Sequence, residues 1–87
     1  MTTVIAVHDV DDVAHWLSSP KRAEFFGAHG MSVRTFVSPG SGRRVGLIIE
    51  NVPSLEALTK ALQGADAADA MKHDGVHPET VELFVAS

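Results

Sequence analysis

The order of six periodic segments constrains the fold of this chain more than any other feature of its sequence. Runs rich in β-branched residues indicate strands, and apolar residues at every third or fourth position indicate helices. Glycine, proline and aspartate separate the segments. The expected strands are residues 3–8, 31–37, 44–50 and 80–86, and the expected helices are residues 13–26 and 53–73. The order along the chain is therefore strand, helix, strand, strand, helix, strand.

Both helices are expected to be interrupted, and a tight turn is expected between the two middle strands. Residues 18–20 include a proline, which breaks the first helix and suits the first turn of a continuation. Gly64 breaks the second helix, and Gly75 is expected to end it. Residues 38–42 are rich in glycine, serine and proline, so they predict a hairpin turn.

This order favours an α+β fold, the ferredoxin-like βαββαβ plait. Its four-stranded antiparallel sheet has the spatial order 4-1-3-2, with strands numbered along the chain, and both helices cover one face. Residues 1–87 are expected to form a single domain. A domain of this size buries only about 60–65% of its unfolded surface, so association with a second copy would stabilise it.

Side chains alternate between the two faces of a strand, which allows each strand residue to be assigned to a face. The face under the helices is predicted to carry Ile5, Val7, Val33, Thr35, Val37, Val45, Leu47, Ile49, Val81, Leu83 and Val85. The outer face is predicted to carry Val4, Ala6, His8, Arg34, Phe36, Gly46, Ile48, Glu50, Glu82 and Phe84. A solvated face should be polar throughout, and exposed apolar patches usually mark partner surfaces. We therefore expect a homodimer packed sheet to sheet; the alternative is a partly apolar open face.

Composition argues against several classes of protein. The chain has no cysteine, which rules out disulfides, thiolate nucleophiles and cysteine-ligated zinc. The formal charge of -4 gives little support for nucleic-acid binding. No apolar run reaches the roughly 20 residues that span a bilayer, and the N-terminal residues lack the basic region of a signal peptide. We expect a cytoplasmic protein with no nucleic-acid or membrane partner.

Four of the five histidines are expected to gather at the end of the fold where the first strand ends and the last begins. His8, His15, His73 and His77 offer imidazoles to a zinc or nickel ion, although their spacing matches no specific metal motif. Ordinary surface histidines are the alternative interpretation. Apart from this candidate metal, no cofactor is expected.

The same end of the fold offers candidates for proton transfer. His73 or His8 could act as a general base, with Asp74 or Asp9 orienting the imidazole ring. His73 has a second explanation, because a cation near a helix C-terminus is favoured by the helix dipole. Asp9 and the aspartates that follow it could instead cap the first helix.

An apolar pocket is expected between the first helix and the sheet. Trp16, Phe25 and Phe26 would line this pocket. Arg22 would hold an anionic group of the ligand. The alternatives are ordinary core packing for the aromatic residues and a solvated helix position for the arginine.

The chain resembles the dimeric α/β-barrel superfamily, and in particular its short single-domain bacterial members. The resemblance rests on the segment order, the apolar outer sheet face, residues 7–12 (VHDVDD) leading to Trp16, and residues 70–76 (AMKHDGV) before the last strand. It covers essentially the whole chain, and it implies a dimer with facing sheets and a ligand pocket between sheet and helices. Members include cofactor-free monooxygenases, lactone isomerases, polyketide cyclases, haem-handling enzymes and stress-response proteins, so the resemblance does not select one activity.

Three functions are consistent with these features. The leading hypothesis is a small homodimeric barrel that binds a small apolar or aromatic ligand in an accessory role. The second is a cofactor-independent enzyme of the monooxygenase, isomerase or polyketide cyclase type that uses His73 or His8. The third is a divalent metal-binding protein that holds nickel or zinc through the histidine cluster.

Overall fold

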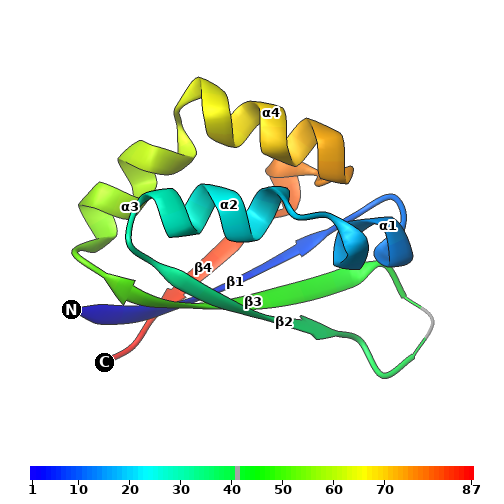
Figure 1. Cartoon of the computed structure of the whole chain (residues 1–87). Helices are drawn as coiled ribbons and strands as arrows, with labels where there is room; N and C mark the ends of the chain where they lie inside the picture. The colour runs from blue at the N-terminus through cyan, green and yellow to red at the C-terminus, as the bar shows by residue number, and fades with distance from the viewer. Residues whose placement is uncertain (41) are drawn as a thin grey trace.

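Four strands form an antiparallel sheet in the computed structural model of the chain, which describes residues 1–40 and 42–87 (Figure 1). Ser41, in the expected hairpin turn, lies outside the described residues. The strands are β1 (Thr2–Asp9), β2 (Ser32–Val37), β3 (Arg44–Val52) and β4 (Glu82–Val85). The helices are α1 (Val13–Ser18), α2 (Lys21–Ala28), α3 (Leu55–Leu62), α4 (Ala65–Asp74) and the short 3-10 helix η1 (Pro78–Thr80).

The order of the strands confirms the predicted α+β ferredoxin-like fold. The sheet order is β2-β3-β1-β4, which is the predicted order 4-1-3-2 read from the opposite edge. Each pair of neighbouring strands is antiparallel. Helices α2, α3 and α4 lie over one face of the sheet, and α1 lies near the end of β1 (Figure 1).

The predicted interruptions of both helices are confirmed. The first helical segment consists of α1 and α2, which meet at residues 19–20, and the second consists of α3 and α4, which meet at residues 63–64. Asp12 caps α1, since its Oδ1 accepts a hydrogen bond from the backbone N–H of His15 at 3.2 Å. Gly75 ends α4 in the left-handed conformation, with φ of 72°. In the part of the chain that is described, no helix is long and apolar enough to cross a membrane.

The predicted face assignment of β1 is wrong. Val4, Ala6 and His8 are buried on the face under the helices, whereas Ile5 and Val7 lie on the outer face. Pairing with β3 determines which residues of β1 face the helices, because directly opposite residues of two paired strands share a face. The partners are Val4 and Ile49, Ala6 and Leu47, and His8 and Val45. Since β1 is apolar at both odd and even positions, its own alternation could not set the phase.

The face assignments of the other strands are confirmed where the helices cover the sheet. The aliphatic residues of the central strand β3 are buried, and Val33 and Leu83 pack against the core. Thr35, Val37 and Val85 were expected under the helices, but they are exposed. All three belong to β2 and β4, which are the two edge strands of the sheet.

The outer face of the sheet carries an apolar patch among charged side chains. Ile5, Phe36 and Phe84 are 43%, 46% and 54% exposed, and Val7 and Ile48 lie half-buried beside them. We call these five residues the outer patch. The ion pairs on the same face are Arg34 with Glu50 at 3.9 Å, Arg44 with Asp9 at 3.2 Å and Arg44 with Glu82 at 2.7 Å. The apolar face that the sequence predicts is therefore present, with Ile5 and Val7 in place of Val4 and Ala6.

A short backbone pairing holds the loop after β1 against the segment after α4. This end bridge consists of Val10 opposite Val76, the Asp11 N–H donating to Gly75 O at 3.0 Å, and the His77 N–H donating to Asp9 O at 3.0 Å. It links the strand that contains His8 to the residues that directly follow Asp74.

Candidate functional site

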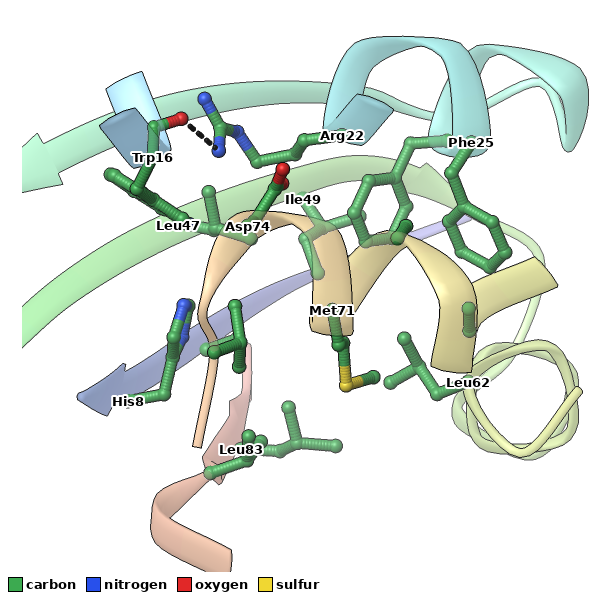
Figure 2. Close-up of a pocket in the computed structure, with 16 residues that line it drawn as sticks. His8, Trp16, Arg22, Phe25, Leu47, Ile49, Leu62, Met71, Asp74 and Leu83 are labelled. Atoms are coloured by element: carbon green, nitrogen blue, oxygen red, sulfur yellow. Dashed lines mark hydrogen bonds between the residues drawn. The ribbon is translucent and has the colours of Figure 1, made fainter. Parts of the chain in front are cut away.

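A cavity of about 80 Å³ lies between the sheet and the helices (Figure 2). Side chains from β1, β3, β4 and all four α-helices line it, and most of them are apolar. Among the described residues, the polar side chains in its wall belong to His8, Arg22 and Asp74. An apolar cavity with a few polar groups is the usual form of a small-molecule site.

His8 faces this cavity from β1. It is only 4% exposed, and its Nε2 atom has no hydrogen-bond partner among the residues that the structure describes. Burial lowers the pKa of His8, and the positive charges of Arg22 and Arg44 lower it further, while Asp9 opposes the shift. The imidazole is therefore neutral near pH 7, and one of its nitrogens is free to bond to a ligand.

Arg22 lies at the cavity wall above Trp16. Its guanidinium carbon is 4.1 Å from the centre of the indole ring, and its Nη1 donates to the backbone oxygen of Trp16 at 3.1 Å (Figure 2). Burial lowers the pKa of Arg22, and the negative charge of Asp74 opposes that shift. The guanidinium remains charged and presents a cation at the rim of an apolar space.

Asp74 joins the cavity to a pair of exposed histidines. It is 3% exposed, and its Oδ1 accepts a hydrogen bond from His73 Nδ1 at 2.9 Å. His15 lies beside His73, with 5.3 Å between the ring centroids, and its Nε2 donates to the backbone oxygen of His73 at 2.8 Å. These contacts tie α1 to the last turn of α4.

His77 lies apart from these residues, on the far side of the end bridge. Its Nε2 donates to Asp11 Oδ1 at 2.5 Å, and its Nδ1 lies 3.4 Å from Glu79 Oε1. These carboxylates raise the pKa of His77, and the main cause is the hydrogen bond that His77 donates to Asp11. Asp9, named as a partner for a catalytic histidine, instead pairs with Arg44 on the outer face.

The structure thus divides the four histidines expected at one end of the fold among three environments. His15 and His73 lie together, with Asp74 between them and the cavity. His8 faces the cavity, and His77 pairs with loop carboxylates. One ligand atom from each of His15, His73 and Asp74 lies within 4.8 Å of the other two.

The aromatic residues expected at a pocket do line the cavity, and they are also part of the core. Trp16 and Phe26 belong to the buried cluster, and Phe25 packs against it. Sequence reasoning missed Met71 and Leu83 as cavity residues. Met71 could have been found from its helical spacing, since it lies three residues before Asp74 on the same face of α4.

Comparison with known proteins shows that this chain is similar to two solved structures in its fold. No family model matches the sequence, and no curated protein matches it. Among solved structures, the crystal structure of an antibiotic biosynthesis monooxygenase matches with a TM-score of 0.62 at 15% identity, over 100% of this chain and 97% of that one. A structural-genomics protein, YJCS, matches with a TM-score of 0.54 at 13% identity, over 99% of this chain and 97% of that one.

The chain shares its ferredoxin-like α+β fold with these two solved structures. The resemblance seen in the sequence is therefore confirmed at the level of fold, and it reaches along the whole chain. At 13% and 15% identity the two neighbours do not transfer an activity, because one fold hosts many functions. Any argument about function has to come from the side chains around the cavity.

Proposed function

We propose that this protein binds a small, largely apolar ligand with one hydrogen-bonding group in the cavity between the sheet and the helices. The observation that supports this most is the unpartnered Nε2 of His8 in an otherwise apolar wall. A buried polar atom without a partner costs about 1–3 kcal/mol. A ligand that hydrogen-bonds to this nitrogen would remove the cost, and the apolar wall would hold the rest of the ligand.

The dimensions and charges of the cavity narrow the class of ligand. A single water needs about 10–15 Å³ of such space, so a cavity of about 80 Å³ accommodates roughly six heavy atoms. The part of a ligand that the cavity encloses is therefore no larger than about one six-membered ring, and its substituents would extend beyond this space. The aromatic side chains of Trp16 and Phe25 suit a flat ring, and Arg22 favours a ligand that has an anionic or electron-rich substituent.

We further propose that the protein is a cytoplasmic homodimer that pairs through the outer patch. Three residues of the outer patch, Ile5, Phe36 and Phe84, are about half exposed in the single chain. Their burial against a second sheet would give the apolar stabilisation that a domain of this size lacks.

Thermal unfolding with three probes tests the ligand proposal. Toluene, phenol and benzoate share one six-membered ring and differ in its substituent, which is a methyl, a hydroxyl or a carboxylate group. Phenol and benzoate are expected to raise the melting temperature more than toluene, and a ligand at 100 times its dissociation constant stabilises by about 2.7 kcal/mol. In the His8→Leu variant the advantage of phenol over toluene should disappear. Failure of all three compounds to raise the melting temperature would contradict the proposal.

A cofactor-independent enzyme that uses the same cavity is a second candidate function. The lowered pKa of His8 favours it, because a neutral imidazole at pH 7 can accept a proton from a bound phenol or enol. The pair of His73 and Asp74 is the other candidate base, since the carboxylate orients that imidazole. Turnover would be followed by ligand absorbance under air and under nitrogen. Loss of turnover in His8→Leu but not in His73→Gln assigns the base to His8, and the reverse assigns it to His73.

A further inference from the structure

Three metal-ligating side chains converge where α1 meets the end of α4. His15 comes from α1, and His73 and Asp74 are the last two residues of α4. One ligand atom from each lies within 4.8 Å of the other two. The carboxylate of Asp74 is 5% exposed, whereas the imidazole of His73 is 45% exposed. The group therefore has a fixed, buried anionic member and histidines that an ion can reach from solvent.

We propose that His15, His73 and Asp74 form a binding site for a divalent transition-metal ion of the zinc type. Two imidazoles and one carboxylate are a donor set that zinc accepts, and three protein ligands leave a fourth position open. Zinc bonds to nitrogen and oxygen are about 2.0–2.2 Å, so tetrahedral ligand atoms lie roughly 3.4 Å apart. The ligand atoms lie within 4.8 Å of one another, and both imidazoles are exposed, so their side chains have room to turn toward a shared ion.

The electrostatics of the site favour a cation and select its chemistry. Helix α4 ends at Asp74, where the helix dipole is negative, and the carboxylate adds a full negative charge. Arg22 faces the same carboxylate and opposes a bound cation. Only an ion that gains strongly from imidazole coordination would overcome this opposition. The site should therefore bind zinc, cobalt or nickel and not magnesium or calcium, which prefer oxygen ligands.

In the absence of metal, hydrogen bonds hold the same three residues. His15 Nε2 donates to the backbone oxygen of His73, and His73 Nδ1 donates to Asp74. A metal would take the place of the protons on the nitrogens that bind it. A purely structural role, which ties α1 to α4, uses the same side chains. The two roles separate in His15→Gln, because glutamine retains an N–H donor for the carbonyl oxygen but is a poor zinc ligand.

Calorimetry with zinc chloride and protein without a histidine tag tests the proposal. The wild type should bind one zinc ion per chain, and cobalt should give the visible absorption of a tetrahedral complex. His15→Gln and His73→Gln should each weaken zinc binding at least about tenfold, since loss of mere supporting contacts already costs 10–100-fold. His77→Gln is the matched control, because it removes a partly exposed histidine outside the group and should bind zinc as the wild type does.

Two results would overturn the proposal. One is the absence of saturable zinc binding by the wild type. The other is equal weakening in His77→Gln, His15→Gln and His73→Gln, which would indicate non-specific binding by surface histidines. Melting temperatures measured in EDTA confirm that each variant is folded without metal. Zinc titration does not involve the apolar cavity probes, so this test and the ligand test can fail separately.

Discussion

The imidazole of His8 meets the indole of Trp16 edge-on, with 5.7 Å between the ring centroids and 72° between the ring planes. This contact fixes the orientation of the imidazole at the cavity wall. The bare Nε2 atom is thus presented in one direction, which is the arrangement that a ligand-binding group requires. The effect of this unpartnered nitrogen on the free energy of unfolding can be measured without knowing the ligand.

We expect His8→Leu to stabilise the ligand-free protein by about 1 kcal/mol. The substitution removes a buried nitrogen that lacks a partner and leaves an apolar side chain in an apolar wall. Urea denaturation at pH 7.5 measures the effect. His29→Leu replaces an exposed histidine and should change stability by less than about 0.5 kcal/mol. A loss of stability in His8→Leu would show that the nitrogen already has a partner.

Acid should destabilise the wild type through His8. Because the pKa of His8 is lowered in the folded state, the unfolded chain binds a proton more readily than the folded chain does. The contribution of a neutral His8 to stability is present above its unfolded pKa of 6.5 and is lost as the pH falls through its folded value. Urea midpoints between pH 7.5 and pH 4.5 should therefore fall more steeply for the wild type than for His8→Leu. Parallel curves would refute this assignment.

His77 should act in the opposite direction. Its pKa is raised by Asp11 and Glu79, so its stabilising contribution is present below 6.5 and is lost as the pH rises through the folded value. The wild type should exceed His77→Gln in stability at pH 5.5, and the difference should shrink by pH 9. Extending the urea series to pH 9 measures both histidines. A difference that does not depend on pH would mean that the ion pairs do not form in solution.

Gly75→Ala should destabilise the protein by about 1–2 kcal/mol. Gly75 has a positive φ of 72°, and an added Cβ would lie 3.2 Å from the side chain of Asp11. Gly27→Ala is the matched control, because Gly27 lies in α2 with nothing within 4 Å of an added Cβ. That control should be stabilising by about 0.5–1 kcal/mol. Equal effects at the two positions would contradict the assigned backbone conformation.

A charge in the outer patch should break the proposed homodimer. Phe84→Glu places a carboxylate among the exposed apolar residues of the outer face, and the variant should sediment as a monomer where the wild type sediments as a dimer. Val37→Glu is the control, since Val37 is 48% exposed but lies on the face opposite the outer patch. Monomeric wild type would remove the dimer from the proposed function.

The fold could be predicted because its determinants are local in the sequence. The break at residues 19–20, the break at residues 63–64 and the αL glycine at 75 each act within one turn of chain. The phase of β1 could not be predicted, because Val4, Ile5, Ala6 and Val7 suit either face and pairing with β3 decides between them. Pairing of this kind depends on residues some 40 positions away.

The same error in phase affected the candidate site. Sequence reasoning assigned His8 to the outer face, although it also named His8 as a candidate base; the structure turns its side chain into the cavity. The separation of His77 from His15 and His73 depends on the path of the chain through the end bridge. Helical or strand periodicity cannot predict that path, because it depends on how the loop after β1 pairs with the loop after α4.

The end bridge limits how far the two chain segments beside the cavity can move apart. His8 lies two residues before Val10, and Asp74 lies two residues before Val76, so the Val10–Val76 pairing joins the chain segments that present these two polar groups. Because backbone hydrogen bonds hold these two segments together, the separation of His8 and Asp74 should change little when a ligand binds. The cavity should therefore select its ligand by size at this end, since a larger ring could not push the two segments apart without breaking backbone hydrogen bonds.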